Sequence, residues 1–177
     1  AGDVVTGLEG TGSPKDPFLV KDINDLKYVR DMVNGKLGKP YSFEGQTLKL
    51  TGSNYSLGMD WEPIGVLKEG CTTEANGVNI LPFSGIIDGM HEDGTVAQVT
   101  SGMNGKPLLN YARRATVRNI AIFGAKIKGY GLVDKYVVDY GEKGIYVNDP
   151  VKNRCIDIEN VTIKANTKIL KSGFIGG

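Results

Sequence analysis

The strongest constraint on the fold is a short repeat in the second half of the chain. Residues 118–122, Arg-Asn-Ile-Ala-Ile, align with residues 159–163, Glu-Asn-Val-Thr-Ile, at an offset of 41 positions. Alternating apolar and polar residues predict a strand, and units that cannot bury an apolar face alone stack into a solenoid. The repeat therefore favours a right-handed parallel β-helix, in which strands stack in register and asparagines form ladders at the bends.

The size of the offset leaves two arrangements open. It fits about two turns of a coil, with a strand near Gly144–Val147 between the copies, or one turn that carries a long loop. Short strands with glycine turns also suit a β-sandwich, which is the alternative fold. The fold class is therefore all-β, with the solenoid preferred.

A single helix is predicted before the first long strand, over residues 22–34. Its apolar residues Ile23, Leu26, Val29 and Val33 recur at helical spacing. Asp22 can cap the first turn, and Asn34-Gly35 ends the helix. Such a helix favours the solenoid, because the exposed edge of an end coil must be covered.

The domain organisation follows from the order of these segments. We expect one domain over residues 1–177, with an N-terminal cap over 7–40 and coils over 41–177. Further strands are predicted at 47–51, 83–89 and 116–123. Insertions are predicted at 66–79 and from 90 to about 106. Trp61 and Ile64 are expected to pack inward. The end of the chain resembles the start of another coil, which predicts a truncated solenoid that self-associates through its exposed last coil.

Charge and cysteine content exclude several classes of protein. The net charge is +1, with 21 basic and 20 acidic residues spread along the chain, so we expect no binding to nucleic acid. The sequence has no run of 18 or more apolar residues, so we expect no membrane insertion. The 25 glycines indicate frequent sharp turns. Cys71 and Cys155 lie outside any zinc-binding spacing, and a small buried apolar role is favoured for them over a mutual disulfide.

Four linked motifs resemble a known group of proteins. They occupy Gly10–Val20, Asp25–Val33, Trp61–Gly65 and Phe83–Gly89. Their order is similar to that in the N-terminal part of bacterial cell-surface proteins with pectate-lyase-like β-helices. The resemblance implies an extracellular or cell-surface location. The sequence departs from the pattern of the group at residues 90–94, where His91 falls near the group's histidine in a shifted context.

The resemblance also directs attention to charged residues. Pectate-lyase-like enzymes bind calcium through several carboxylates and use an arginine or lysine as the base, which makes Asp88, Glu92 and Asp93 the candidate metal ligands. The candidate bases are Arg113, Arg114 and Arg118. Asp157 and Glu159 alternate on one strand and could serve a glycosidase only with a partner on the next coil. Solvated surface charge is the favoured interpretation throughout, so no catalytic residue is assigned, no cofactor is expected, and calcium is the one ion considered.

Binding of sugar without chemistry needs exposed aromatic rings and hydrogen-bonding side chains. The second half of the chain supplies a tyrosine-rich stretch, and the candidate ligand-binding residues are Tyr130, Tyr136, Tyr140 and Tyr146, with Tyr111 nearby. We therefore interpret the chain as a non-catalytic extracellular β-helix module for structure or adhesive display, in contact with polysaccharide or cell-wall glycan. The alternatives are a fragment of a polysaccharide lyase or glycoside hydrolase, and a cap that assists assembly of a longer β-helix.

Overall fold

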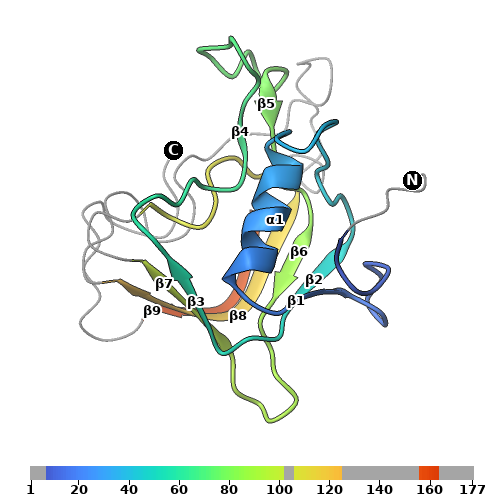
Figure 1. The fold of residues 1–177 in the computed structure, drawn as a ribbon, viewed down its shortest axis with the longest axis vertical. Helices are drawn as coiled ribbons and strands as arrows, with labels where there is room; N and C mark the ends of the chain where they lie inside the picture. The colour runs from blue at the N-terminus through green and yellow to red at the C-terminus, as the bar shows by residue number, and fades with distance from the viewer. Residues whose placement is uncertain (1–6, 102–105, 125–155, 164–177) are drawn as a thin grey trace.

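The computed structural model describes residues 7–101, 106–124 and 156–163, and their regular secondary structure is mostly strand (Figure 1). They form one helix and two sheets. The elements in chain order are β1 (Phe18–Val20), α1 (Ile23–Val33), β2 (Thr47–Leu50), β3 (Asn54–Leu57), β4 (Val66–Leu67), β5 (Ile80–Leu81), β6 (Ile86–Asp88), β7 (Ala97–Ser101), β8 (Ala115–Gly124) and β9 (Ile156–Ile163). The predicted all-β class, with one short helix, agrees with this content of strand.

The larger sheet has seven strands, and every pairing in it is parallel. Its order is β1-β2-β6-β8-β7-β3, and β9 also pairs with β8. One continuous row of paired residues crosses five strands, and it consists of Phe18, Leu48, Ile87, Val117 and Ile158. All but Ile158 are buried, and Ile158 packs against the core. The row therefore runs through the apolar interior across all five strands.

Strand β8 changes partners halfway along its length. Residues Thr116–Arg118 pair with β6, whereas Ile120–Gly124 pair with β7. Asn119 separates the two halves with a φ of 59°, and Asn160 separates the halves of β9 with a φ of 48°. This left-handed conformation is unfavourable for most residues but is adopted by asparagine more readily. The two asparagines therefore mark a bend between two faces of the sheet.

The internal repeat is borne out by the strand register. Arg118 pairs with Glu159, Ile120 with Val161, and Ile122 with Ile163, at the predicted offset. Because β8 and β9 are direct neighbours, the two copies are one step of the sheet apart and the connection between them is long. The strand considered near Gly144–Val147 lies outside the described residues.

Helix α1 begins and ends as the sequence predicts. The side chain of Asp22 accepts a hydrogen bond from the backbone N–H of Asp25 (2.9 Å), and Asn34 forms the C-cap. The buried face of the helix consists of Leu26, Val29, Met32 and Val33. Burial of each large apolar side chain contributes about 1.5–3 kcal/mol. The helix contacts β1 and β3, and Figure 1 shows it in front of the strands.

The segment after β3 packs inward, as predicted. Trp61 and Ile64 are fully buried, and Trp61 Nε1 donates to the carbonyl oxygen of Pro107 (3.0 Å). The side chain of Asn34 joins this segment to the end of α1, because its Nδ2 donates to Pro63 O (3.1 Å) and its Oδ1 accepts from Gly65 N (2.8 Å). One polar side chain thus ties the helix to the loop.

The two predicted insertions have different outcomes. Residues 66–79 do lie outside the large sheet, and they begin with β4, which forms the small antiparallel pair with β5. The insertion predicted from 90 to about 106 is wrong in part, because β7 lies within it and pairs with both β3 and β8. The sequence Ala-Gln-Val-Thr-Ser alternates weakly and contains one large apolar residue, which is why the strand was missed.

The structure also bears on the expectations for the cysteines and for membrane insertion. Cys71 is a free thiol, and Cys155 lies outside the described residues. Among the residues described, no helix has the length and apolar character needed to span a bilayer.

Candidate functional site

A row of four charged residues crosses the outer side of the sheet before the bend. Lys49 on β2 pairs with Asp88 on β6, Asp88 with Arg118 on β8, and Arg118 with Glu159 on β9. These positions alternate with the buried row, so their side chains lie on the opposite side of the strands. The signs alternate along the row, which places every charge beside an opposite one.

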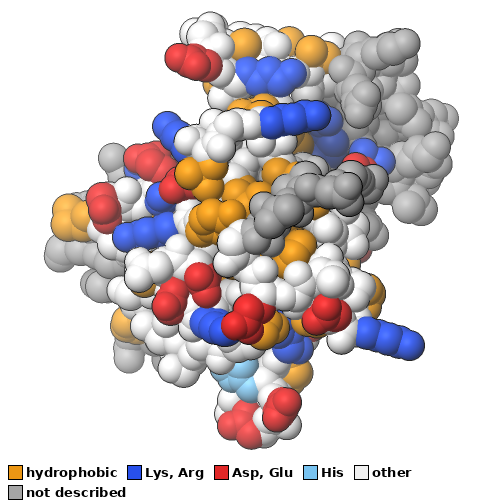
Figure 2. Space-filling model, turned by 45° about the vertical axis from the view of Figure 1, so that its right-hand side comes forward, with side chains coloured by type: hydrophobic (Ala, Val, Ile, Leu, Met, Phe, Trp, Pro, Cys, Tyr) orange, Lys and Arg blue, Asp and Glu red, His pale blue; other side chains and the backbone are white. Residues whose placement is uncertain are grey.

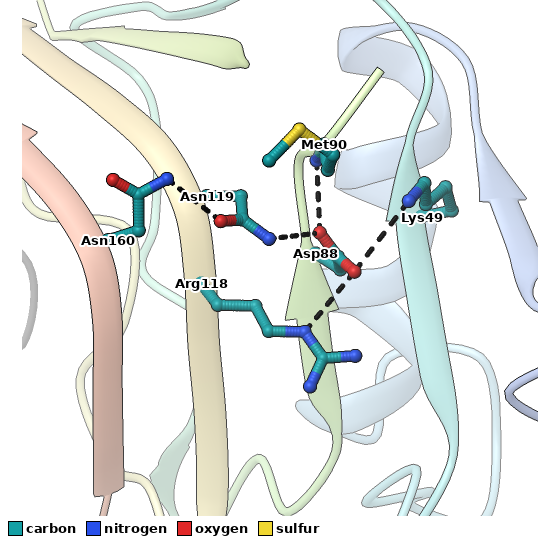
Figure 3. Close-up of polar contacts among 6 residues, drawn as sticks. All are labelled: Lys49, Asp88, Met90, Arg118, Asn119 and Asn160. Carbon is teal, nitrogen blue, oxygen red and sulfur yellow. Dashed lines mark hydrogen bonds and ion pairs between the residues drawn. The ribbon is translucent and has the colours of Figure 1, made fainter. Parts of the chain in front are cut away.

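Asp88 is the centre of this row (Figure 3). Its Oδ1 accepts hydrogen bonds from Asn119 Nδ2 (2.9 Å) and Met90 N (3.0 Å). Its Oδ2 lies 3.2 Å from Arg118 Nε and 3.6 Å from Lys49 Nζ. Burial raises the pKa of this carboxyl group, but the hydrogen bonds from Asn119, Met90 and Arg118 and the charge of Lys49 outweigh the burial, so the pKa of Asp88 is lowered from 3.8.

The asparagines at the bend extend the same network. Asn160 Nδ2 donates to Asn119 Oδ1 (2.9 Å), and Asn119 in turn donates to Asp88, so three strands are joined by side-chain hydrogen bonds in addition to the backbone ladder. Figure 3 shows the three side chains in line across β9, β8 and β6. The expected asparagine ladder is therefore present, and Asp88 continues it on β6.

A hairpin formed by residues 90–96 projects after β6. Met90 and Val96 form an antiparallel bridge at its base. His91 Nε2 donates to the carbonyl oxygen of Gly52 (3.0 Å), and His91 Nδ1 lies 3.0 Å from Thr95 Oγ1. Asp93 accepts from the hydroxyl (2.6 Å) and the backbone N–H (3.0 Å) of Thr95, and these bonds lower the pKa of Asp93. The hairpin is thus fastened to the β2–β3 turn by His91.

A groove of about 840 Å³ lies between this hairpin and the outer side of β1 and β2. Figure 2 shows the histidine of the hairpin, in pale blue, with acidic side chains beside it. Met90 and Leu19 supply apolar surface, and Lys49 supplies a cation. The remaining lining residues are Thr51, His91, Glu92 and Asp93. The groove therefore combines apolar walls with groups of both charges, which is the composition of a small-ligand or saccharide site.

The structure separates the three candidate metal ligands. Glu92 and Asp93 line the groove, whereas Asp88 is bound by Lys49, Arg118, Asn119 and the backbone of Met90. Within residues 7–101, 106–124 and 156–163, no cluster of three or more His, Cys, Asp or Glu side chains is placed to hold a metal ion. Calcium binding stays a prediction, and Glu92 and Asp93 are the residues through which it would act.

The candidate bases are also separated. Arg118 contacts Asp88, but Arg113 donates to the carbonyl oxygen of Gly77, and Arg114 forms an ion pair with Glu44 (3.4 Å). Glu159 lies in the charged row, and Asp157 pairs in register with Thr116.

Most of the tyrosine-rich stretch cannot be placed. Tyr130, Tyr136, Tyr140 and Tyr146 lie outside the described residues, so their role stays a prediction. Tyr111 is buried, and its hydroxyl group donates to Glu74 (2.8 Å).

Sequence reasoning missed the part of the groove that comes from β1 and β2. Lys49 and Leu19 each lie between two buried residues. The alternation Leu48-Lys49-Leu50 was visible in the sequence, whereas Phe18-Leu19-Val20 is apolar throughout and gave no sign that Leu19 points outward. Their closeness to Glu92 and Asp93 depends on the β2–β6 register, which the sequence does not reveal.

Comparisons of the chain with models of protein families, with curated protein sequences and with solved structures find no match. The resemblance to pectate-lyase-like surface proteins thus stays a prediction from the motifs.

Proposed function

We propose that the chain is a non-catalytic, extracellular module of a bacterial cell-surface protein, built as a right-handed parallel β-helix, that serves in structure or adhesive display and contacts polysaccharide. The observation that carries this proposal is the five-strand row from Phe18 to Ile158. Parallel strands that recur in one register, with a second parallel row beyond a common bend, are what successive coils of a solenoid produce.

The mechanical part of the proposal rests on how the coils are joined. Buried apolar residues fill the interior, the backbone ladder joins each strand to the next, and Asp88, Asn119 and Asn160 add side-chain bonds across β6, β8 and β9. A unit held together in this way resists bending and keeps its outer faces in fixed positions. That property suits a stalk or display element.

The groove supports the contact with polysaccharide. Its apolar walls can accommodate the faces of sugar rings, and Lys49, Thr51 and the two carboxylates can bind hydroxyl groups.

The test is a panel of polysaccharides assayed in parallel for binding and for cleavage, with and without calcium. The variant Glu92→Gln/Asp93→Asn is compared with the unaltered chain, and Glu69→Gln, which lies away from the groove, is the matched control. Binding without product release supports the proposal, and the release of new chain ends by the unaltered chain alone refutes its non-catalytic part.

A polysaccharide lyase or glycoside hydrolase is the second candidate, and one observation favours it. Glu92, Asp93 and Lys49 line the same groove, so two carboxylates and a potential base converge there. The hydrogen bonds of Asp93 to Thr95 and the ion pair of Lys49 with Asp88 favour a structural role for both. The cleavage arm of the panel separates the two candidates: unsaturated ends indicate a lyase, and saturated reducing ends indicate a hydrolase.

A further inference from the structure

The outer side of the sheet changes character at the bend formed by Asn119 and Asn160. Before the bend it carries the charged row from Lys49 to Glu159. Beyond the bend the sheet consists of β3, β7 and the second halves of β8 and β9, and none of these segments contains Asp, Glu, Lys, Arg or His. In a chain with 23% charged residues, this uncharged face stands out.

Two registered rows make up the uncharged face. The first consists of Asn54, Gln98, Ala121 and Thr162, and the second of Ser56, Thr100 and Phe123. The residues between them, such as Tyr55, Val99 and Ile122, are buried, so the two rows point outward. Asn54, Ser56 and Thr162 are exposed, and the others are half-buried. With strands about 4.8 Å apart, the first row spans about 14 Å.

Hydrogen bonds hold part of this face in a fixed arrangement. Gln98 Nε2 donates to Thr100 Oγ1 (3.1 Å), and Thr100 Oγ1 donates to Asn54 Oδ1 (2.6 Å). Side chains that are already oriented lose less conformational entropy when a ligand binds. The amide and hydroxyl groups thus form an ordered array beside the half-buried ring of Phe123.

We infer that this face, defined by its two outer rows, is a binding platform for an uncharged polysaccharide chain. This inference rests on the proposed contact with polysaccharide, gives that contact a second place besides the groove, and names its ligand class. Amides and hydroxyls match sugar hydroxyl groups, and the Phe123 ring offers a surface for the apolar side of a pyranose.

The charge and composition of the face exclude the competing occupants. On the described strands beyond the bend, an acidic polysaccharide would lose hydration without meeting a cation. A second protein chain would find apolar surface mainly on Ala121 and Phe123, which is too little for the core of a stable interface.

The test measures the affinity of the whole chain for two soluble polymers by titration calorimetry: a neutral β-glucan and polygalacturonate. The variants are Phe123→Ala and Asn54→Ala/Thr162→Ala, and the latter changes only exposed side chains. Thr116→Ala, on β8 before the bend, is the matched control, and Lys49→Ala tests the groove. Circular dichroism and a melting curve establish that each variant is folded.

The expected result is binding of the neutral glucan in preference to polygalacturonate, weakened about three- to tenfold by Phe123→Ala and by the double variant and unchanged by Thr116→Ala. Preference for polygalacturonate, or a loss of binding in Lys49→Ala with the platform variants unaffected, overturns this inference and leaves the proposed contact with polysaccharide standing. Failure to bind either polymer, or any other in the panel, refutes both.

Discussion

Replacement of Asp88 by alanine tests whether the side-chain network holds neighbouring strands together. The substitution removes the acceptor of three hydrogen bonds, from Asn119 Nδ2, Met90 N and Arg118 Nε, at a side chain that is only 12% exposed. Hydrogen bonds to a charged group contribute about 1.5–3 kcal/mol each in buried sites. The ion pairs with Lys49 and Arg118 add little, because those side chains are about one-third exposed to solvent.

Two such bonds would sum to about 3–6 kcal/mol, and because Asn119 and Arg118 are only half-buried we expect Asp88→Ala to lower the free energy of unfolding by a smaller amount, about 2–4 kcal/mol. Asp88→Asn keeps an oxygen acceptor in place and should lose about 1 kcal/mol, chiefly through the lost charge. Urea denaturation followed by circular dichroism gives both values as shifts in the midpoint. The reasoning is refuted if alanine changes the midpoint no more than asparagine does, or if both variants unfold like the unaltered chain.

The same residue predicts a dependence on pH. Because the pKa of Asp88 is lowered in the folded chain from 3.8, the unfolded chain takes up a proton first as the solution is acidified. The contribution of Asp88 to stability is therefore complete above the ordinary pKa and is lost as the pH falls through the lowered one. In Asp88→Asn this part of the acid dependence should disappear, which urea midpoints at pH 6 and at decreasing pH would detect.

Three further substitutions test other parts of the fold. Asn34→Ala removes both hydrogen bonds from α1 to the segment after β3, and it should lower the free energy of unfolding, measured by urea denaturation, by about 1–3 kcal/mol. Asn54→Ala, at an exposed position, should lower it by less than about 0.5 kcal/mol. Burial raises the pKa of Tyr55 to about 12, so its contribution to stability is complete below pH 10 and is lost as the pH rises through 12. Tyrosinate absorbance should show a late-titrating group that Tyr55→Phe removes. Asn119→Val should melt at a lower temperature than Asn119→Gly, because valine is strained at a φ of 59°; equal melting temperatures would contradict the role of the bend.

Local features of the fold were predictable because short-range chemistry determines them. The helix over 23–33 follows from its apolar spacing and from Asp22. The similarity of residues 118–122 to residues 159–163 predicted two strands of a stacked repeat, but it left open whether β8 and β9 are direct neighbours. Strand β7 was missed because Ala97 and Val99 are a weak apolar signal, and its place between β3 and β8 depends on pairings far apart in the chain. Local propensity cannot reveal such contacts.

The candidate site was less predictable than the fold, since it depends on which strands become neighbours. Glu92 and Asp93 were recognisable as acidic residues of a turn, but Lys49 lies about 40 positions earlier and reaches the same groove only through the register of β2 with β6. Asp88 was grouped with the turn because it is close in sequence. Its position on the strand instead directs it toward Arg118 and Asn119.

The bend explains why one sheet can present two surfaces of different chemistry. In a straight strand, outward positions form one continuous face, and charged and uncharged rows would lie side by side. Asn119 and Asn160 turn the strands at matching positions, so Arg118 and Glu159 face one direction and Ala121 and Thr162 another. If the bend separates a charged face from a glycan platform, loss of the turn should impair binding even when Phe123 and Gln98 are intact. Asn119→Val therefore provides a decisive comparison: a folded variant that still binds the neutral glucan as tightly as the unaltered chain would show that the platform does not depend on the bend.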